Sequence, residues 1–227
     1  MERKRSRIAL ALMGKSPRPG WVKTRLSPPL TPEEAAEVYR AMLLDKFDQA
    51  ASLDCAEIWM VYAAPEDESF FRANSPPGAH LLLQRGADLG ERMHNVVSDV
   101  LKSGAAGALL TGTDLPTVDN MLLRAAVEHL AGGAVDLVIG PSVDGGYYLI
   151  GLCDAEAAIF SDIEWSTDRV FAQTLARARA VGMRVVILEE RYDVDDVAGL
   201  DRLSLNLNEN PMLAPRTAAF LRRRRLR

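Results

Sequence analysis

The sequence predicts an α/β fold in which helices cover the faces of one central sheet. Short aliphatic runs recur along the 227 residues, helix-like segments separate them, and no internal repeat or low-complexity linker interrupts the pattern. The predicted strands cover residues 8–13, 58–63, 80–83, 108–111, 136–139 and 184–188. We therefore expect a single domain over 1–227, with basic tails at about 1–6 and 221–227.

The best-marked helix is predicted to begin just after Thr31. Residues 31–34 (Thr-Pro-Glu-Glu) supply an N-cap, a proline at the first helical position and a glutamate at the third, which together satisfy free backbone N–H groups at a helix start. Apolar side chains with helical spacing follow and should face the sheet; they are Ala35, Val38, Tyr39, Met42, Leu43 and Phe47. Further helices are expected over 89–101, 118–130, 168–180 and 197–205.

Composition and charge exclude several classes of protein. The chain is 48% hydrophobic and 26% charged, which is ordinary for a globular protein. Its net charge is −4, and because residues 1–7 carry +3 and residues 216–227 carry +6, the segment between them carries −13. Such an acidic body does not suit a protein that grips nucleic acid, so we expect no nucleic-acid partner.

Apolar runs and cysteines indicate the compartment. No apolar run approaches the ~20 residues that span a bilayer, and the run near the N-terminus is too short for a signal peptide. We therefore expect a cytoplasmic protein without a membrane span. The spacing of Cys55 and Cys153, with only three histidines in the chain, argues against a disulfide scaffold or a structural zinc site. These features specify no oligomeric state.

A cation-rich loop follows the first predicted strand. Its start, residues 14–16 (Gly-Lys-Ser), resembles the end of a phosphate-binding P-loop, but Ala9 stands where that motif needs glycine, and the prolines at 17 and 19 prevent a helix from starting there. The loop over 14–29 carries four cations, namely Lys15, Arg18, Lys23 and Arg25. Because open α/β sheets bind ligands at the carboxyl ends of their strands, we favour phosphate binding over a ligand-free basic loop.

Aspartates that follow two of the predicted strands are candidates for a metal site. Asp114 ends an apolar strand, where it could hold a divalent cation facing phosphates, or could simply cap the next helix. Asp193 and Asp195 lie on one side of an extended segment after the last strand. One of them could complete a metal site with Asp114, whereas Asp196 suits a helix N-terminus.

A glycine pair lies between two apolar runs at 140–151. Asp144, Gly145 and Gly146 are typical of a hairpin turn, because glycine supplies the positive φ that such turns need. Two adjacent glycines also let backbone N–H groups approach a ligand, and Asp144 could accept hydrogen bonds from a sugar hydroxyl. Both interpretations are compatible.

Six sequence blocks occur in a fixed order along the chain. They are Lys-x-Pro-x-Pro-Gly-x-Val-Lys-Thr-Arg-Leu at 15–26, Asp-Leu-Gly-Glu-Arg-Met at 88–93, Thr-Asp-Leu-Pro at 113–116, Gly-Pro-x-x-Asp-Gly-Gly-Tyr-Tyr-Leu-Ile-Gly-Leu at 140–152, Trp-Ser-Thr at 165–167 and Tyr-Asp-Val-Asp at 192–195. From about residue 7 to 207, the chain resembles the bacterial glycosyltransferase-A-like family labelled nucleotide-diphospho-sugar transferases, some of which are associated with arsenosugar biosynthesis. More distantly, it resembles the phospholactate and molybdenum-cofactor guanylyltransferases.

The resemblance implies a fold and a set of binding roles. The fold is a single-domain α/β/α sandwich with a mostly parallel, Rossmann-like central sheet, in which the first loop wraps phosphates and the Asp114 position binds Mg²⁺ or Mn²⁺. Residues implied to lie against the nucleobase are Gln84, Asp88, Leu89 and Gly90. Residues implied to line the sugar or second-substrate pocket are Asp144, Gly145, Gly146 and Tyr147, with Trp165, Ser166 and Thr167 nearby.

The chain departs from the related enzymes at two points. Sugar-nucleotide pyrophosphorylases usually carry Gly-x-Gly-Thr-Arg in the first loop, of which only Gly14 and the Thr24-Arg25 pair remain here. Glycosyltransferases of this fold usually carry Asp-x-Asp, whereas Pro116 takes the place of the second aspartate here. The first departure weakens a triphosphate-binding role, and the second weakens a glycosyl-transfer role.

The leading hypothesis is a metal-dependent glycosyltransferase that uses a nucleotide-sugar donor and a small-molecule acceptor. Mg²⁺ or Mn²⁺ on Asp114, with Asp193 or Asp195, would neutralise the leaving diphosphate, and Asp144 would act as general base. Charge on the phosphates would be stabilised by the loop cations Lys15, Lys23 and Arg25, with Gly14 allowing close approach. The alternatives are a nucleotidyltransferase, which couples a nucleoside triphosphate to a phosphorylated acceptor and releases pyrophosphate, and a non-catalytic nucleotide-binding protein.

Overall fold

A seven-stranded sheet forms the centre of the molecule, in the order β3-β2-β1-β4-β6-β5-β7. The computed structural model describes residues 7–225. The strands are β1 (Ile8–Gly14), β2 (Ala56–Tyr62), β3 (His80–Leu83), β4 (Gly107–Gly112), β5 (Leu137–Pro141), β6 (Tyr147–Leu152) and β7 (Val185–Ile187). Strand β6 runs antiparallel to β4 and β5, and the other pairs within residues 7–225 are parallel. The predicted α/β class with a mostly parallel sheet is confirmed.

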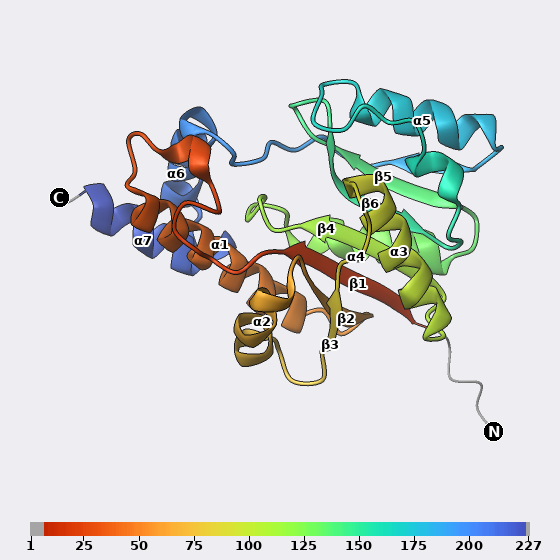
Figure 1. Cartoon of the computed structure of the whole chain (residues 1–227), viewed down its shortest axis with the longest axis horizontal. Coiled ribbons are helices and arrows are strands. Elements are labelled where there is room, and N and C mark those ends of the chain that lie inside the picture. The colour runs from red at the N-terminus through yellow and green to blue at the C-terminus, as the bar shows by residue number, and fades with distance from the viewer. Residues whose placement is uncertain (1–6, 226–227) are drawn as a thin grey trace.

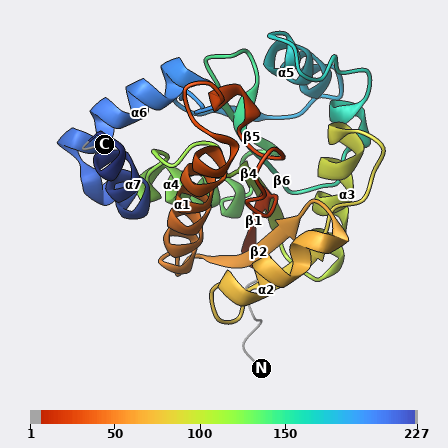
Figure 2. The same cartoon turned by 60° about the vertical axis from the view of Figure 1, so that its left-hand side comes forward.

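Seven helices form layers around this sheet within the described residues (Figures 1 and 2). They are α1 (Pro32–Ala51), α2 (Glu68–Asn74), α3 (Leu89–Lys102), α4 (Asn120–Ala131), α5 (Val170–Ala180), α6 (Val197–Glu209) and α7 (Pro215–Arg225). Helices α1, α2 and α4 pack on one face, and α3 and α5 pack on the other. Helices α6 and α7 pack on the outer side of α1 and add a third hydrophobic cluster. No helix of this part of the chain is both long and apolar enough to cross a membrane.

Strand β1 shows why the centre of the sheet is apolar on both faces. Ile8, Leu10 and Leu12 belong to the cluster beneath α1 and α4. Ala9 and Ala11 belong to the cluster beneath α3. Because successive side chains of a strand point to opposite faces, a central parallel strand covered on both sides has to be apolar throughout.

The order of the strands places a binding edge between β1 and β4. From β1 the chain moves through β2 to β3 at one edge, and then returns to form β4 on the other side of β1. In the β1–β4 register Met13 is paired with Gly112, so both strands end at the same edge. Such a switch point, at the carboxyl ends of parallel strands, is where open α/β sheets bind ligands.

Two local predictions are confirmed in detail. The Thr31 hydroxyl accepts the Glu34 backbone N–H at 3.2 Å, and the Glu34 carboxylate accepts the Thr31 N–H at 3.0 Å, so the capping box at the start of α1 is complete. The Asp-Gly-Gly segment joins β5 to antiparallel β6, as a hairpin turn should. The hairpin also makes 147–152 a strand of the sheet, next to β4.

The two ends of the chain were both expected to be basic tails. Residues 221–225 instead continue helix α7, and Leu221 is buried against the third hydrophobic cluster. Residues 1–6 and 226–227 lie outside the described part of the chain. Helix α2 was not expected either, because its seven residues are too few to reveal a helical period.

Candidate active site

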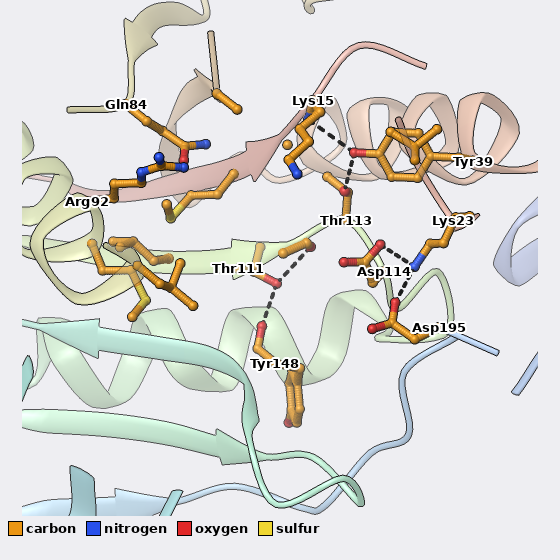
Figure 3. A pocket seen from close by; sticks show the side chains of 18 of the residues that line it. Lys15, Lys23, Tyr39, Gln84, Arg92, Thr111, Thr113, Asp114, Tyr148 and Asp195 are labelled. Atoms are coloured by element: carbon orange, nitrogen blue, oxygen red, sulfur yellow. Dashed lines mark hydrogen bonds and ion pairs between the residues drawn. The ribbon is translucent and has the colours of Figure 1, made fainter. Parts of the chain in front are cut away.

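A pocket of about 530 Å³ opens at the switch point between β1 and β4 (Figure 3). Its walls come from the first loop, the end of β4, the start of β6, the start of α3 and the segment before α6. Nine of the predicted site residues line it, namely Gly14, Lys15, Lys23, Arg25, Gln84, Leu89, Asp114, Tyr147 and Asp195. The structure therefore brings three of the four loop cations and two of the predicted aspartates into one space.

Lys23 lies at the centre of the charged end of this pocket. Its Nζ is 2.5 Å from Asp114 Oδ1 and 2.7 Å from Asp195 Oδ1 (Figure 3). The Lys23 side chain is only 4% exposed, whereas the two carboxylates are 44% and 46% exposed. Burial on its own would lower the pKa of the Lys23 ammonium, but the charges and hydrogen bonds of Asp114 and Asp195 together outweigh it and raise the pKa above its ordinary value.

The backbone explains how Lys23 reaches this position. Lys23 has a left-handed conformation, with φ of 48°, and precedes the short 3₁₀ helix η1 (Thr24–Leu26). Leu26, at the end of η1, is fully buried in the hydrophobic cluster formed by α1, α6 and α7. The apolar anchor at Leu26 holds the loop against the body of the protein and leaves Lys23 beside the end of β4.

The segment before α6 brings a second aspartate to the site. The Val194 backbone N–H donates to the Asp114 carbonyl oxygen at 3.1 Å, and the Val194 side chain is fully buried. In an extended segment the neighbours Asp193 and Asp195 then point away from the core. Asp196 caps α6 as expected, because its carboxylate accepts the Gly199 N–H at 2.8 Å.

Asp144, Asp193 and Asp195 form an acidic group beside the pocket. Partial burial raises the pKa of Asp193 to about 6, and the negative charges of Asp144 and Asp195 add to this shift. Asp144 is exposed, and one of its oxygens accepts the Gly146 backbone N–H at 3.0 Å. An incoming group at this side of the pocket therefore meets negative charge.

Asp114 and Asp195 provide the chemistry that a divalent cation needs. One oxygen of each contacts the same cationic atom, Lys23 Nζ, so the two carboxylates converge on a single cation position. Oxygen ligands suit Mg²⁺ and Mn²⁺, and Mg²⁺ usually takes one or two carboxylates and fills its other positions with water and substrate phosphate. Residues 7–225 contain no group of three or more His, Cys, Asp or Glu side chains placed to hold a metal, so in this part of the chain Asp114 and Asp195 are a pair, and a metal-binding role for Asp193 stays a prediction.

Tyr39 is a pocket residue that we expected only in the core. Its hydroxyl lies 3.0 Å from Thr113 Oγ1 and accepts the Lys15 backbone N–H at 3.1 Å. Burial, with the nearby charge of Asp114, raises the pKa of Tyr39 to about 12. The sequence showed Tyr39 as one member of an apolar stripe, and its bonds to residues 15 and 113 depend on the folded sheet.

Replacing Tyr39 by phenylalanine should destabilise the protein by about 1–2 kcal/mol, because the part-buried Lys15 N–H and the buried Thr113 hydroxyl both lose their partner. Urea unfolding of Tyr39→Phe and wild type measures this loss. Equal stability of the two proteins would contradict a structural role for the hydroxyl.

The end of the pocket away from Lys23 is less charged. Figure 3 shows Gln84 and Arg92 there, with Leu89 also in the wall. The Gln84 amide donates to the Val61 carbonyl at 3.3 Å, and Arg92 Nε donates to the Gly86 carbonyl at 3.2 Å. Arg92 was not predicted to line the site. It lies in the first turn of α3, a helix whose start at residue 89 was predicted.

Trp21 was not expected at the site either. It lies in the wall of the pocket, although its side chain is 69% exposed. The Arg18 guanidinium lies 4.9 Å from the centre of the Trp21 ring and also pairs with the buried Asp67 at 3.2 Å. The loop cation Arg18 therefore braces the loop and does not line the pocket.

The other predicted site residues have local structural partners and do not line this pocket. Asp88 caps α3 through the Glu91 N–H at 2.8 Å. Gly90 packs against Trp165, where a Cβ would lie 2.7 Å from the indole. The Thr167 hydroxyl donates to the Glu164 carbonyl at 2.7 Å. Asp144, Gly145, Gly146, Ser166 and Asp193 do not line the pocket either, so ligand roles for these residues stay predictions.

Gly145 lies so close to the backbone of Asp168 that the position has no room for a side chain. Its φ is +87°, and a Cβ would lie 2.1 Å from the Asp168 carbonyl oxygen. Gly145→Ala should therefore cost at least about 3 kcal/mol of stability, from backbone strain and overpacking together. Gly182→Ala is a matched control, because Gly182 has a similar φ of +78° with nothing within 4 Å of the added carbon. Equal losses in thermal unfolding for the two variants would contradict the close contact with Asp168.

Comparison with protein families assigns the chain to one of them. The profile of a family described as "Uncharacterized protein conserved in bacteria (DUF2064)" matches residues 46–167, more than half of the chain. The chain belongs to this family. The DUF2064 chain is also similar to a crystal structure from Desulfovibrio desulfuricans G20, provisionally named a nucleotide-diphospho-sugar transferase. The two are 31% identical, the match covers 95% of this chain and 94% of that one, and the TM-score is 0.88.

More distant solved structures share the fold of the DUF2064 chain. The 4-diphosphocytidyl-2C-methyl-D-erythritol synthase of Anaerococcus prevotii is 11% identical over 90% of this chain and 97% of its own, with a TM-score of 0.59. The complex of Rv0371c with manganese from Mycobacterium tuberculosis H37Rv is 16% identical over 87% and 97%, with a TM-score of 0.51. At such identities the likeness concerns the fold. Comparison with curated protein sequences gave no match.

Proposed function

We propose that this DUF2064 protein is a metal-dependent glycosyltransferase, which transfers a sugar from a nucleotide-sugar donor to a hydroxyl group of a small acceptor. The observation that carries the proposal is the charge arrangement of the pocket. Cations of the first loop and the carboxylates of Asp114 and Asp195 line the same space at the switch point of the sheet. A nucleoside diphosphate needs the cations, and a metal ion and a hydroxyl acceptor need the carboxylates.

The charges of the pocket favour one direction for the donor. Lys15, Lys23 and Arg25 would face the diphosphate, because they are the cations of the charged end. The nucleobase would then lie toward Gln84, Leu89 and Arg92. A Mg²⁺ or Mn²⁺ ion held by Asp114 and Asp195 would neutralise charge on the diphosphate.

The acidic group favours an uncharged acceptor. Asp144 and Asp193 would repel a phosphorylated acceptor, but they suit a sugar or other hydroxyl compound. In the proposed reaction the Asp144 carboxylate takes the proton of the acceptor hydroxyl, and the acceptor oxygen bonds to the anomeric carbon. The bond from that carbon to the diphosphate oxygen breaks, so the nucleoside diphosphate leaves with the electron pair, stabilised by the loop cations.

A nucleotidyltransferase is the second candidate, and the first loop favours it. Its three cations that line the pocket, Lys15, Lys23 and Arg25, suit a triphosphate as well as a diphosphate. Such an enzyme would release pyrophosphate. The acidic group counts against a phosphorylated acceptor for this reaction.

Ligand screening and product analysis test both candidates. The purified protein is heated with nucleoside triphosphates, diphosphates or nucleotide sugars, each with and without Mn²⁺. A ligand present at 100 times its Kd should stabilise the native state by about 2.7 kcal/mol. Stabilisation by one nucleotide sugar beyond its parent diphosphate, followed by diphosphate release when hydroxyl acceptors are added, supports the glycosyltransferase.

Other outcomes decide against it. Stabilisation by a triphosphate, with pyrophosphate release, favours the nucleotidyltransferase. Binding without turnover across a broad acceptor panel favours a non-catalytic nucleotide-binding protein. If no nucleotide shifts the melting temperature, the proposed use of the pocket is wrong.

A further inference from the structure

The charged end of the pocket has one position for a cation, and either the Lys23 ammonium or a divalent metal ion suits it. The Lys23 ammonium fills the position between Asp114 and Asp195, at 2.5 and 2.7 Å, and its side chain is almost fully buried there. The pocket's other loop cations differ, since within residues 7–225 neither Lys15 nor Arg25 forms an ion pair. Lys23 is therefore the loop cation that neutralises the proposed metal ligands.

A divalent cation and this ammonium exclude each other. Both need the same two carboxylate oxygens, and two cations at such close range repel strongly where water is scarce. Metal binding therefore requires the ammonium to leave, and leaving is unfavourable unless the ammonium finds another anion. A lysine side chain is a flexible four-carbon chain, so its ammonium can move while the backbone stays in place.

We propose that Lys23 couples metal binding to donor binding. Without donor, the Lys23 ammonium holds the cation position and keeps metal affinity low. With donor, the diphosphate draws the ammonium away from Asp114 and Asp195, and the metal ion takes the position. This coupling rests on the proposed function only in taking a phosphate group as the natural partner of the displaced lysine.

Coupling of this kind is reciprocal. If a phosphate-bearing ligand raises the affinity for the metal, the metal raises the affinity for that ligand by the same factor. The site would then fill with donor and metal together. A bound metal without donor would be rare.

Mn²⁺ binding to four proteins tests the proposal without any turnover. Free Mn²⁺ is measured by electron paramagnetic resonance with wild type, Lys23→Met, Lys23→Arg and Lys15→Met. Lys23→Met should bind Mn²⁺ alone about tenfold or more tightly than wild type, a coupling of the usual size. Lys15→Met removes a charge from the same pocket without freeing the carboxylates, and should change the affinity much less. Lys23→Arg restores a cation between the carboxylates and should stay close to wild type.

A second measurement adds sulfate, an oxyanion that chelates Mn²⁺ only weakly in solution. Sulfate should raise the Mn²⁺ affinity of wild type and leave that of Lys23→Met unchanged. Melting curves show whether each variant is folded. If Lys23→Met is not, wild type decides the question, because a Mn²⁺ affinity that sulfate leaves unchanged would overturn the coupling.

The results separate this inference from the proposed function. Equal Mn²⁺ affinities for wild type and Lys23→Met, or equal gains for Lys23→Met and Lys15→Met, overturn the coupling even if the enzyme turns over nucleotide sugars. A gain confined to Lys23→Met supports the competition even if no nucleotide sugar is a substrate.

Discussion

Replacing Asp114 by asparagine should reduce turnover by about a hundredfold to a thousandfold and leave the fold intact. The carboxylate converges with Asp195 on the cation position, so its loss removes one of the two proposed metal ligands and with it the cation that would neutralise the leaving diphosphate. The fold should survive because the Asp114 side chain is half-exposed and its backbone carbonyl still accepts the Val194 N–H.

Steady-state rates and urea unfolding of Asp114→Asn check both parts of this prediction. Asp201→Asn is the control, because Asp201 is an exposed carboxylate on α6 that does not line the pocket. Metal-dependent turnover retained by Asp114→Asn would remove Asp114 from the proposed site. Loss of activity with a matching loss of folded protein would make Asp114 a structural residue.

The second large effect concerns Lys46, a buried lysine that does not line the pocket. Lys46 is 2% exposed on α1, and its ammonium donates to the Gln49 side-chain oxygen at 2.6 Å. No carboxylate pairs with it among residues 7–225, and burial lowers the pKa of Lys46 to about 7. A protonated Lys46 therefore opposes folding at neutral pH.

The sign of the pH dependence follows from proton binding in the two states. The unfolded chain keeps the Lys46 proton up to about pH 10.4, whereas the folded protein releases it near pH 7. Between these values the unfolded state binds more protons, so stability increases as the pH increases. The cost is complete below pH 7 and amounts to roughly 5 kcal/mol as an upper limit, since each pKa unit corresponds to about 1.4 kcal/mol.

Lys46→Met should remove this dependence and stabilise the protein by a few kcal/mol at pH 6. Urea unfolding at pH 6 and pH 9 measures the dependence. Between these pH values the free energy of unfolding of wild type should increase by about 2–3 kcal/mol more than that of Lys46→Met. Lys102→Met, at an exposed position at the end of α3, is the control and should keep the wild-type profile. A variant less stable than wild type at pH 6 would contradict an unfavourable buried charge.

Local signals in the sequence were sufficient for much of the fold. The helix start at Thr31 was predictable because its capping bonds join residues three apart. The buried strands were predictable because both their faces are apolar. Helix α7 escaped prediction because its run of arginines resembles a solvated tail, and only its packing against α1 shows that Leu221 is a core residue.

The site was predictable residue by residue but not as an arrangement. Lys23, Asp114 and Asp195 were each candidates, yet their meeting joins residues up to 172 positions apart and depends on the order of the strands. Tyr39 was missed for the same reason, because its partner Thr113 is 74 positions away. Conversely, Asp88 shows a signal with two meanings, since a helix cap and a ligand contact favour the same residue type.

The third hydrophobic cluster connects the charged end of the pocket to the C-terminal helices. Leu26 of the first loop, Val194 beside Asp195 and Leu221 of α7 share this cluster, which packs on α1 and not on the sheet. Lys23 and Asp195 thus both depend on the C-terminal helices, and all of these lie outside the residues 46–167 that the family profile matches. We expect removal of α6 and α7 to release both the first loop with Lys23 and the segment with Asp195 from α1, so a relative without these helices must hold its first loop by other contacts.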